Sequence, residues 1–360
     1  MQIGIVGLPF SGKSTLFQTI TKTHLDQSQL MKSQSHKAVI RVPDERLDKL
    51  SEIFKPQKIT YASIEFVDVI GLQKGDSGTS QFTGNFLSNV KTNDALIQVV
   101  RLFRNEVIQH PEGTINMLRD IDTFETEFIL SDLAIIEKRI ENLKKQILKI
   151  HEDHLKKELA VLEKCNDSLQ NAKPLRDARL SREDLDILKP YQLLTEKPML
   201  IALNCDESQV KDTEQFLDTL VKNKLGRNIK AVAFFGQLEL EMSELTSSDA
   251  KVFMEEYSIK ESALTSIIRE SYDLIGLQSF FTVGEDECRA WTIHKGMTVQ
   301  EAAGVIHTDF FNKFIRAEVV RYDDFINFGS FTGAKEKGAW RLEGKEYIVK
   351  DGDIISIRHN

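Results

Sequence analysis

The sequence is poor in cysteine and has no long apolar run, and each absence excludes a class of protein. Its three cysteines, Cys165, Cys205 and Cys288, lie far apart and form no C-x-x-C pair. They therefore predict neither a disulfide framework nor a cysteine-based metal site, and they suit a reducing, cytoplasmic environment. No apolar stretch approaches the length of a membrane span, and the chain opens on a strand-like run, so we expect neither a membrane segment nor a signal peptide.

The sequence also lacks an excess of basic residues. Its 360 residues contain 55 Asp and Glu against 47 Lys and Arg, which gives a formal net charge of −8. A protein that coats nucleic acid by diffuse attraction would be basic, so any contact with RNA must come from a local patch. No recognition of a DNA sequence is expected. The chain is too long for one compact core, so two or three domains are expected.

What the sequence does contain is a phosphate-binding motif near its start. Residues 7–15 read GLPFSGKST, which matches G-x-x-x-x-G-K-S with Gly7, Gly12, Lys13 and Ser14 in register. A strand-like run precedes the motif and a helix-like run follows it, as in a P-loop. Backbone N–H groups and the helix N-terminus would face phosphates, Lys13 would reach the β- and γ-phosphates, and the Ser14 hydroxyl would ligate Mg²⁺. The alternative is a glycine turn before an ordinary helix.

A second motif follows at the end of a later apolar strand. Asp68-x-x-Gly71 closes the run IEFVD. Asp68 is expected to act on Mg²⁺ through water, and the Gly71 N–H to meet the γ-phosphate. The next residue is Leu72, where Ras-like enzymes carry a glutamine that orients water. Because leucine cannot orient water by hydrogen bonding, any hydrolysis must use another group to orient the attacking water.

The loop Asn204-Cys205-Asp206-Glu207 stands where a nucleotide base is read. A guanine reader has the pattern N-K-x-D, but here the second residue is Cys205 and the fourth is Glu207. The extra methylene of Glu207 displaces the carboxylate that would accept from guanine. Asn204 can still pair with an adenine-type edge, which offers an acceptor beside an amine donor. The loop therefore predicts adenine in preference to guanine; the alternative is a polar loop without a ligand.

The arrangement of apolar runs predicts an α/β fold. Strand-like runs alternate with helix-like stretches, which indicates a mostly parallel sheet covered on both faces. These runs are residues 2–5, 63–69, 95–100, 199–204 and 230–235. We expect residues 1–127 and 196–277 to form one nucleotide-binding domain.

The remaining residues predict two further domains. Apolar positions alternate at spacings of three and four in a coiled-coil seam, at Leu133, Ile136, Ile140, Leu143, Ile147 and Ile150. Residues 128–195 should therefore form an inserted helical arm with nearly balanced charge. Residues 278–360 contain short strand-like pieces and should form a small α+β domain. In it, residues 334–341 (AKEKGAWR) place basic side chains around Trp340, which suits either RNA or a solvated loop with one core tryptophan. The stretch HPEG (residues 110–113) suits a turn better than a catalytic histidine.

The chain resembles the YchF or Obg-like ATPases in these motifs and in three further stretches: residues 42–50 (VPDERLDKL), 119–140 (RDIDTFETEFILSDLAIIEKRI) and 329–354 (GSFTGAKEKGAWRLEGKEYIVKDGDI). That family comprises P-loop proteins of the GTPase class that carry N-x-x-E. The resemblance implies a coiled-coil arm inserted in the nucleotide domain and a C-terminal, β-grasp-like TGS domain. It also implies hydrolysis of ATP and GTP, ribosome association and a stress-linked regulatory role.

The resemblance assigns roles to individual positions. The phosphate-binding positions are Phe10, Ser11, Gly12, Lys13, Ser14 and Thr15. The base-side positions are Asn204, Cys205, Glu207 and Gly236. Asp68 and Gly71 stand at the second switch. In the first switch the family carries a threonine that ligates Mg²⁺, and counting back without gaps from residues 42–44 puts Lys32 there. Because lysine only donates, it cannot ligate Mg²⁺ and would pair with the γ-phosphate.

We therefore expect a cytoplasmic protein that binds and hydrolyses ATP, and GTP more weakly, with Mg²⁺. Lys13, Asp68 and Gly71 would be its catalytic residues, and Ser14 and Asp68 its metal-side residues. The arm and the TGS domain would contact the ribosome or structured RNA. The alternative function is a non-hydrolysing, nucleotide-sensing adaptor or an RNA-binding module of the same fold, which Lys32 and Leu72 favour.

Overall fold

The computed structural model describes residues 1–21, 36–69, 82–149, 152–223, 228–245, 249, 252, 254 and 262–360. They form two compact units. Unit 1 contains Met1–Ala38 and Glu65–Leu274, and unit 2 contains Val39–Ile64 and Ile275–Asn360. Among the helices in the described part of the chain, none combines the length and the apolar character that a membrane span needs.

Unit 1 is built on a six-stranded sheet with the order β2-β4-β1-β5-β6-β7. The strands are β1 (Gln2–Gly7), β2 (His36–Arg41), β4 (Ser63–Asp68), β5 (Ala95–Arg101), β6 (Met199–Asn204) and β7 (Ile229–Phe234). β1 pairs in parallel with β4 and β5, and β6 pairs in parallel with β5 and β7. Each strand-like run predicted from the sequence is a strand, so the predicted α/β class is confirmed.

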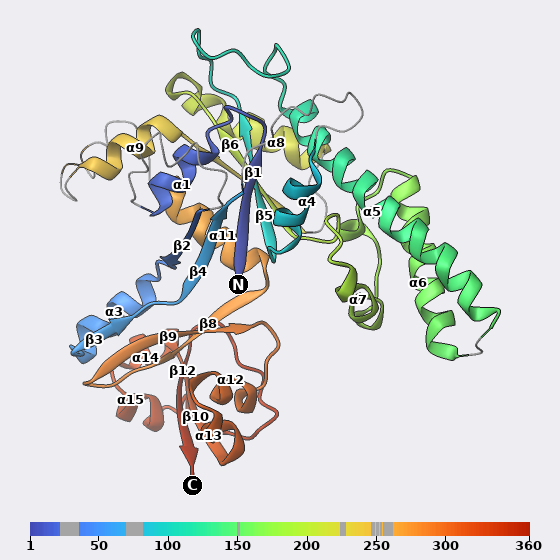
Figure 1. The fold of residues 1–360 in the computed structure, drawn as a ribbon. Coiled ribbons are helices and arrows are strands. Elements are labelled where there is room, and N and C mark those ends of the chain that lie inside the picture. Colours follow the sequence, from blue (N-terminus) through green and yellow to red (C-terminus); the bar gives the residue numbers. More distant parts are fainter. Residues whose placement is uncertain are drawn as a thin grey trace. The chain divides into compact units, whose positions relative to one another are not determined.

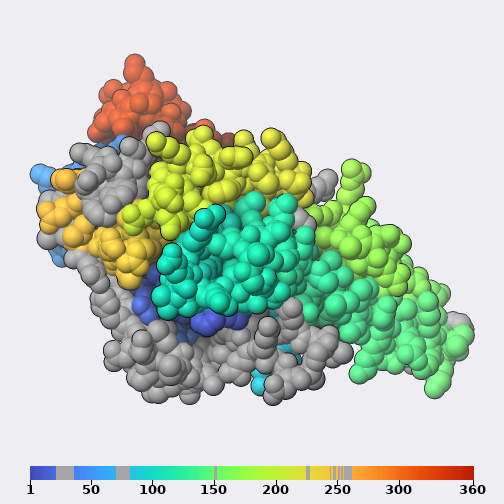
Figure 2. All heavy atoms as spheres, turned by 90° about the horizontal axis from the view of Figure 1, so that it is seen from above, coloured from blue at the N-terminus to red at the C-terminus, as the bar shows by residue number. Residues whose placement is uncertain are grey.

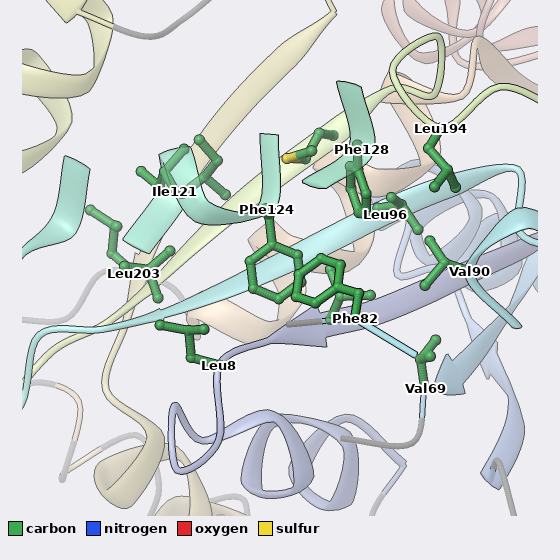
Figure 3. Close-up of a cluster of buried hydrophobic side chains, with 14 of the residues drawn as sticks. Leu8, Val69, Phe82, Val90, Leu96, Ile121, Phe124, Phe128, Leu194 and Leu203 are labelled. Carbon is green, nitrogen blue, oxygen red and sulfur yellow. The ribbon is translucent and has the colours of Figure 1, made fainter. Parts of the chain in front are cut away.

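Helices cover both faces of this sheet (Figure 1). α1 (Lys13–Thr21), α9 (Gly236–Glu244) and α11 (Ala263–Leu274) lie on one face, and α4 (Gly84–Lys91), α5 (Met117–Ile147) and α8 (Thr213–Asn223) on the other. The second face is filled by an aromatic cluster: the rings of Phe82 and Phe124 lie 4.8 Å apart, and Phe128 packs edge-on to Phe124 (Figure 3). Burying these side chains against Leu96 of β5 fixes α5 on the sheet.

The inserted arm is a helical pair that leaves the sheet through α5. α5 packs on α6 (Asp153–Gln170), and the short α7 (Arg182–Leu188) closes the end of their core. Ile136 and Leu143 of the predicted seam are fully buried; Ile150 lies outside the described residues. The helix begins before the predicted boundary at residue 128, because the Asn116 side chain accepts from the Arg119 N–H and caps it at Met117.

A buried carboxylate joins the arm to the sheet. Asp132 has no solvent exposure. It accepts the backbone N–H groups of Leu194 and Thr195 at 3.0 and 2.8 Å and the Thr195 hydroxyl at 2.7 Å. These bonds hold the chain where it returns from the arm toward β6.

Unit 2 contains a second six-stranded sheet, with the order β11-β10-β12-β8-β9-β3. Its strands are β3 (Lys58–Thr60), β8 (Leu277–Thr282), β9 (Glu287–His294), β10 (Phe314–Arg321), β11 (Arg341–Glu343) and β12 (Asp353–His359). Its helices are α3 (Glu45–Phe54), α12 (Val299–Ile306), α13 (Thr308–Asn312), α14 (Tyr322–Phe328) and α15 (Phe331–Glu336). One face buries Ala317 and Val319 of β10 against Val299 and Ala303 of α12.

Residues 39–64 belong to unit 2, although we expected them in the nucleotide-binding domain. Arg46 of α3 forms ion pairs with Asp44 at 2.8 Å and Asp351 at 2.7 Å. Phe54 stacks on Phe325 with ring centroids 5.6 Å apart. β3 pairs in parallel with β9. The contacts with Asp351, Phe325 and β9 are long-range, and so the local sequence pattern of residues 39–64 contains no sign of them.

The buried hydrogen bonds of Asp132 predict an effect of its substitution on stability. Asp132→Asn replaces one acceptor by an N–H₂ donor that faces buried donors, so the free energy of unfolding should fall by about 2–4 kcal/mol. Urea unfolding followed by circular dichroism measures it. Glu137→Gln is the matched control, since Glu137 lies on the same helix and is exposed, and it should leave the midpoint unchanged. Equal midpoints for both variants would contradict the role given to Asp132.

Candidate functional site

The predicted P-loop joins β1 to α1 in unit 1. Gly7 and Gly12 have φ values of 156° and 98°. A Cβ atom on Gly7 would lie 2.5 Å from the Val99 carbonyl oxygen, and one on Gly12 would lie 2.1 Å from Asn204 Nδ2. Glycine is therefore required at both positions by close approach as well as by backbone conformation.

Phe10 lies in the middle of this loop in a strained conformation. Its φ is 62°, in the left-handed region that side chains other than glycine and asparagine avoid. Its side chain is 62% exposed. Holding a bulky residue there costs about 1–2 kcal/mol. The loop thus keeps a P-loop backbone despite an unfavourable residue.

Lys13 is buried, and its ammonium group binds the loop itself. Nζ donates to the carbonyl oxygens of Gly7 at 3.1 Å and Leu8 at 2.9 Å. Burial lowers the pKa of Lys13 to about 8, and the nearby Asp68 carboxylate partly offsets this. Lys13 must exchange these carbonyls for phosphate oxygens when a nucleotide binds.

The two predicted metal-side residues lie together beside Lys13. Asp68 is the last residue of β4 and accepts a hydrogen bond from the Ser14 hydroxyl at the start of α1. Burial raises the pKa of the Asp68 carboxyl, while Lys13 and His36 act in the opposite direction. A hydroxyl and a carboxylate are the oxygen ligands that suit Mg²⁺, which takes one or two protein oxygens and fills its remaining positions with phosphate and water. The residues present therefore fit this ion.

Asn204 connects three loops at the carboxyl edge of the sheet. Its Nδ2 donates to the Ser11 carbonyl oxygen at 3.1 Å, and its Oδ1 accepts the Gly236 N–H at 3.0 Å. The side chain is buried. Asn204 thus holds the P-loop and the loop after β7 at a fixed spacing, and only one donor and one acceptor position of its carboxamide remain for a base.

A cavity of about 290 Å³ opens beside these contacts within unit 1. It is lined by Gly12 and Thr15 and by residues 103–105, 204–207 and 235–238. In Figure 2 the teal segment after β5 lies next to the yellow segments that follow β6 and β7. The cavity therefore brings Cys205, Glu207 and Gly236, all predicted base-side positions, to the end of the P-loop.

The wall formed by residues 103–105 was not predicted from the sequence. Arg101, the last residue of β5, is buried and positions this wall. Its Nε donates to the Phe103 carbonyl oxygen at 3.2 Å, and its guanidinium carbon lies 4.5 Å from the centre of the Phe103 ring. The available signal was topological: these residues follow a central parallel strand, and the carboxyl ends of such strands meet at one edge.

Three residues predicted from the sequence to bear on the nucleotide site lie outside the described residues: Gly71, Leu72 and Lys32. His110 is buried, and its Nε2 lies 3.0 Å from Asp120 Oδ2. Its Nδ1 accepts the Glu112 N–H at 3.1 Å within the turn of residues 110–113. This geometry agrees with the turn expected for HPEG.

The lowered pKa of Lys13 predicts a pH dependence of nucleotide binding. The ammonium form binds phosphate, and in the free protein it is lost as the pH rises through about 8. The affinity for a nucleoside triphosphate should therefore fall by about tenfold between about pH 7 and pH 9. Equilibrium titration at each pH measures this. Lys13→Arg stays charged throughout, so its affinity should not vary with pH, whereas a flat profile for the unmodified protein would contradict the prediction.

Comparison with known proteins agrees with this geometry. A family model described as "50S ribosome-binding GTPase" matches residues 2–205, and the YchF-GTPase_C model, described as "Protein of unknown function (DUF933)", matches residues 277–360. The "Ribosome-binding ATPase YchF" of Haemophilus influenzae is 42% identical over 99% of this chain and 98% of its own length. That of Bacillus subtilis is 39% identical with the same coverage.

A solved structure extends the similarity to the whole fold. The YchF GTPase of Schizosaccharomyces pombe superposes with a TM-score of 0.86 at 31% sequence identity and covers 99% of this chain and 97% of its own. The similarity therefore covers the segments of this chain that form the P-loop, the arm and the C-terminal unit. On this evidence the chain belongs to the YchF family of P-loop GTPases.

Proposed function

We propose that this protein binds ATP with Mg²⁺ at the carboxyl edge of the unit 1 sheet and hydrolyses it, and that it binds GTP more weakly. The observation that carries the proposal is the contact between Ser14 and Asp68 beside Lys13, next to a cavity that fits a base. Phosphates would lie along the backbone of residues 10–15 at the N-terminus of α1.

Each residue of the chain has a distinct part in this proposal. Ser14 and Asp68 would hold Mg²⁺, which supplies charge neutralisation for the phosphates. Lys13 would donate to the β- and γ-phosphates in place of the carbonyls of Gly7 and Leu8. Gly71 would donate its N–H to the γ-phosphate, as expected from the sequence. Phe103 would cover one face of the base, because Arg101 fixes its ring.

The base preference follows from the loop after β6. Asp206 caps the turn that follows the loop, because its carboxylate accepts the Ser208 N–H at 3.0 Å. Glu207 is exposed at the cavity. The extra methylene of its side chain would displace the carboxylate from the position at which the aspartate of N-K-x-D accepts from the guanine N–H donors. Adenine, which needs no such carboxylate, would be bound at least as tightly as guanine.

A titration with both nucleotides tests this preference. ATP should bind at least as tightly as GTP, and Glu207→Asp should raise the affinity for GTP by about tenfold while leaving that for ATP nearly unchanged. Glu214→Asp makes the same change at an exposed site on α8 and should alter neither. A strong GTP preference in the unmodified protein would refute the proposal for the base.

Hydrolysis is tested by single-turnover assays with Mg·ATP. Asp68→Asn removes the negative charge beside the metal position, so it should slow turnover by more than about tenfold. The affinity for ATP should fall by a smaller factor than the turnover rate. The alternative, a nucleotide-sensing adaptor, predicts tight ATP binding without turnover in the unmodified protein. That result would reject hydrolysis and leave the binding site in place.

Ribosome association is proposed because the curated relatives are named for it. The arm and unit 2 differ in the basic side chains that each could offer to ribosomal RNA. Some arm lysines pair with carboxylates, as Lys144 does with Glu163 at 2.9 Å and Lys156 with Asp153 at 3.5 Å. Lys335 of unit 2 is exposed, and its ammonium lies 4.3 Å from the Trp340 ring centre. The contact with RNA is therefore proposed to depend more on unit 2 than on the arm.

A further inference from the structure

Unit 2 contains a second cavity, of about 140 Å³, on the sheet face opposite its main core. Side chains alternate along β10, so Ala317 and Val319 enter the core while Glu318 faces the other side. Glu318 and Ser356 of neighbouring strands form the floor of the cavity, and Phe331 and Trp340 form its wall. The space suits one planar ring system.

The aromatic wall is packed against neighbouring rings and backbone. The Trp340 ring packs edge-on to Phe331, with ring centroids 5.0 Å apart. The backbone N–H of Trp340 donates to the Ala334 carbonyl oxygen at 3.2 Å. Phe331 in turn packs on Phe325, with centroids 4.8 Å apart. Trp340 is half-buried. An aromatic surface that is held in place before binding loses little entropy when a ligand packs on it.

Glu318 provides a polar group inside this cavity. Its side chain is only 13% exposed, and Oε1 accepts from Arg358. Within the described part of the chain, Oε2 has no hydrogen-bond partner. A carboxylate has about four acceptor positions, so Glu318 can accept an amine donor from a ligand while it stays paired with Arg358.

Two cationic side chains contact residues that line the cavity. Lys335 lies over Trp340, and Arg358 is 62% exposed beside Glu318. These two cations would attract a phosphate held beside the cavity. The ligand indicated by these groups is therefore planar, carries an amine donor and is attached to an anionic backbone.

We propose that this cavity binds one amine-bearing base, adenine, cytosine or guanine, of a single-stranded RNA. The base packs against Trp340, its exocyclic amine donates to Glu318, and the adjacent phosphates bind Lys335 and Arg358. Uracil has a carbonyl oxygen in place of that amine, which Glu318 repels. The proposal rests on the proposed ribosome association, to which it adds the contact site and its base preference.

The experiment uses the full chain labelled with 5-fluorotryptophan. The chain contains two tryptophans and therefore gives two ¹⁹F resonances. Trp291→Phe assigns them. Eight-nucleotide RNAs of A, C or U are added, with AMP and CMP as free nucleotides. The A and C oligomers should shift the Trp340 resonance and bind about tenfold or more tightly than the U oligomer. Free AMP and CMP should bind much more weakly than the oligomers, because they lack the adjacent phosphates; equal affinity would assign the cavity to a free nucleotide and overturn the RNA proposal.

Two variants and a control separate the contribution of the Glu318 carboxylate from that of the Lys335 ammonium. Glu318→Gln, whose amide accepts and donates, should reduce the preference over U to within about twofold. Lys335→Met should weaken all oligomers about equally and reduce the salt dependence. Lys345→Met removes an exposed lysine of the same unit away from the cavity and should change nothing. A preference that survives Glu318→Gln would overturn the base assignment.

Ribosome co-sedimentation distinguishes failure of this proposal from failure of the association. If the protein sediments with ribosomes but no oligomer shifts the Trp340 resonance, the cavity is not the contact and the association stands. If the oligomers bind as expected, Lys335→Met should also reduce co-sedimentation while Lys345→Met does not. Equal co-sedimentation of the two variants would contradict a role for this cavity on the ribosome.

Discussion

The carboxamide of Asn204 is the interaction on which the nucleotide site depends. It spans the Ser11 carbonyl and the Gly236 N–H, so one side chain at the end of β6 fixes the loops that follow β1 and β7. Its approach to Gly12 is so close that no side chain could replace that glycine's hydrogen. The phosphate end and the base end of the cavity are thereby held at one spacing, as pre-organised binding requires.

The electrostatics of the site follow from burial. Lys13 and Asp68 are both desolvated, which shifts their pKa values in opposite directions toward their neutral forms, and each partly restores the charge of the other. Ser14 adds a hydrogen bond to the carboxylate. An incoming polyphosphate and its metal would replace these internal contacts with stronger ones between full charges.

Much of unit 1 could be predicted from the sequence because its signals are local. The P-loop motif, the apolar strands and the coiled-coil seam each occupy a short window, and the residues around Lys13, Asp68 and Asn204 meet because parallel strands end at one edge. Residues 39–64 could not be assigned this way. They lie between β2 and β4 in the chain, but Arg46, Phe54 and β3 contact partners more than two hundred residues away. The Phe103 wall was missed for a related reason, since its position depends on Arg101 and not on a motif.

The central claim, that this P-loop binds the phosphates of a nucleotide, is tested most directly by equilibrium titration of a fluorescent ATP analogue in the presence of Mg²⁺. Lys13→Ala removes the buried ammonium, and Lys222→Ala removes an exposed one on α8 of the same unit. The account predicts that Lys13→Ala weakens binding by at least about tenfold and that Lys222→Ala does not weaken it. Equal affinities for the two variants would contradict the account.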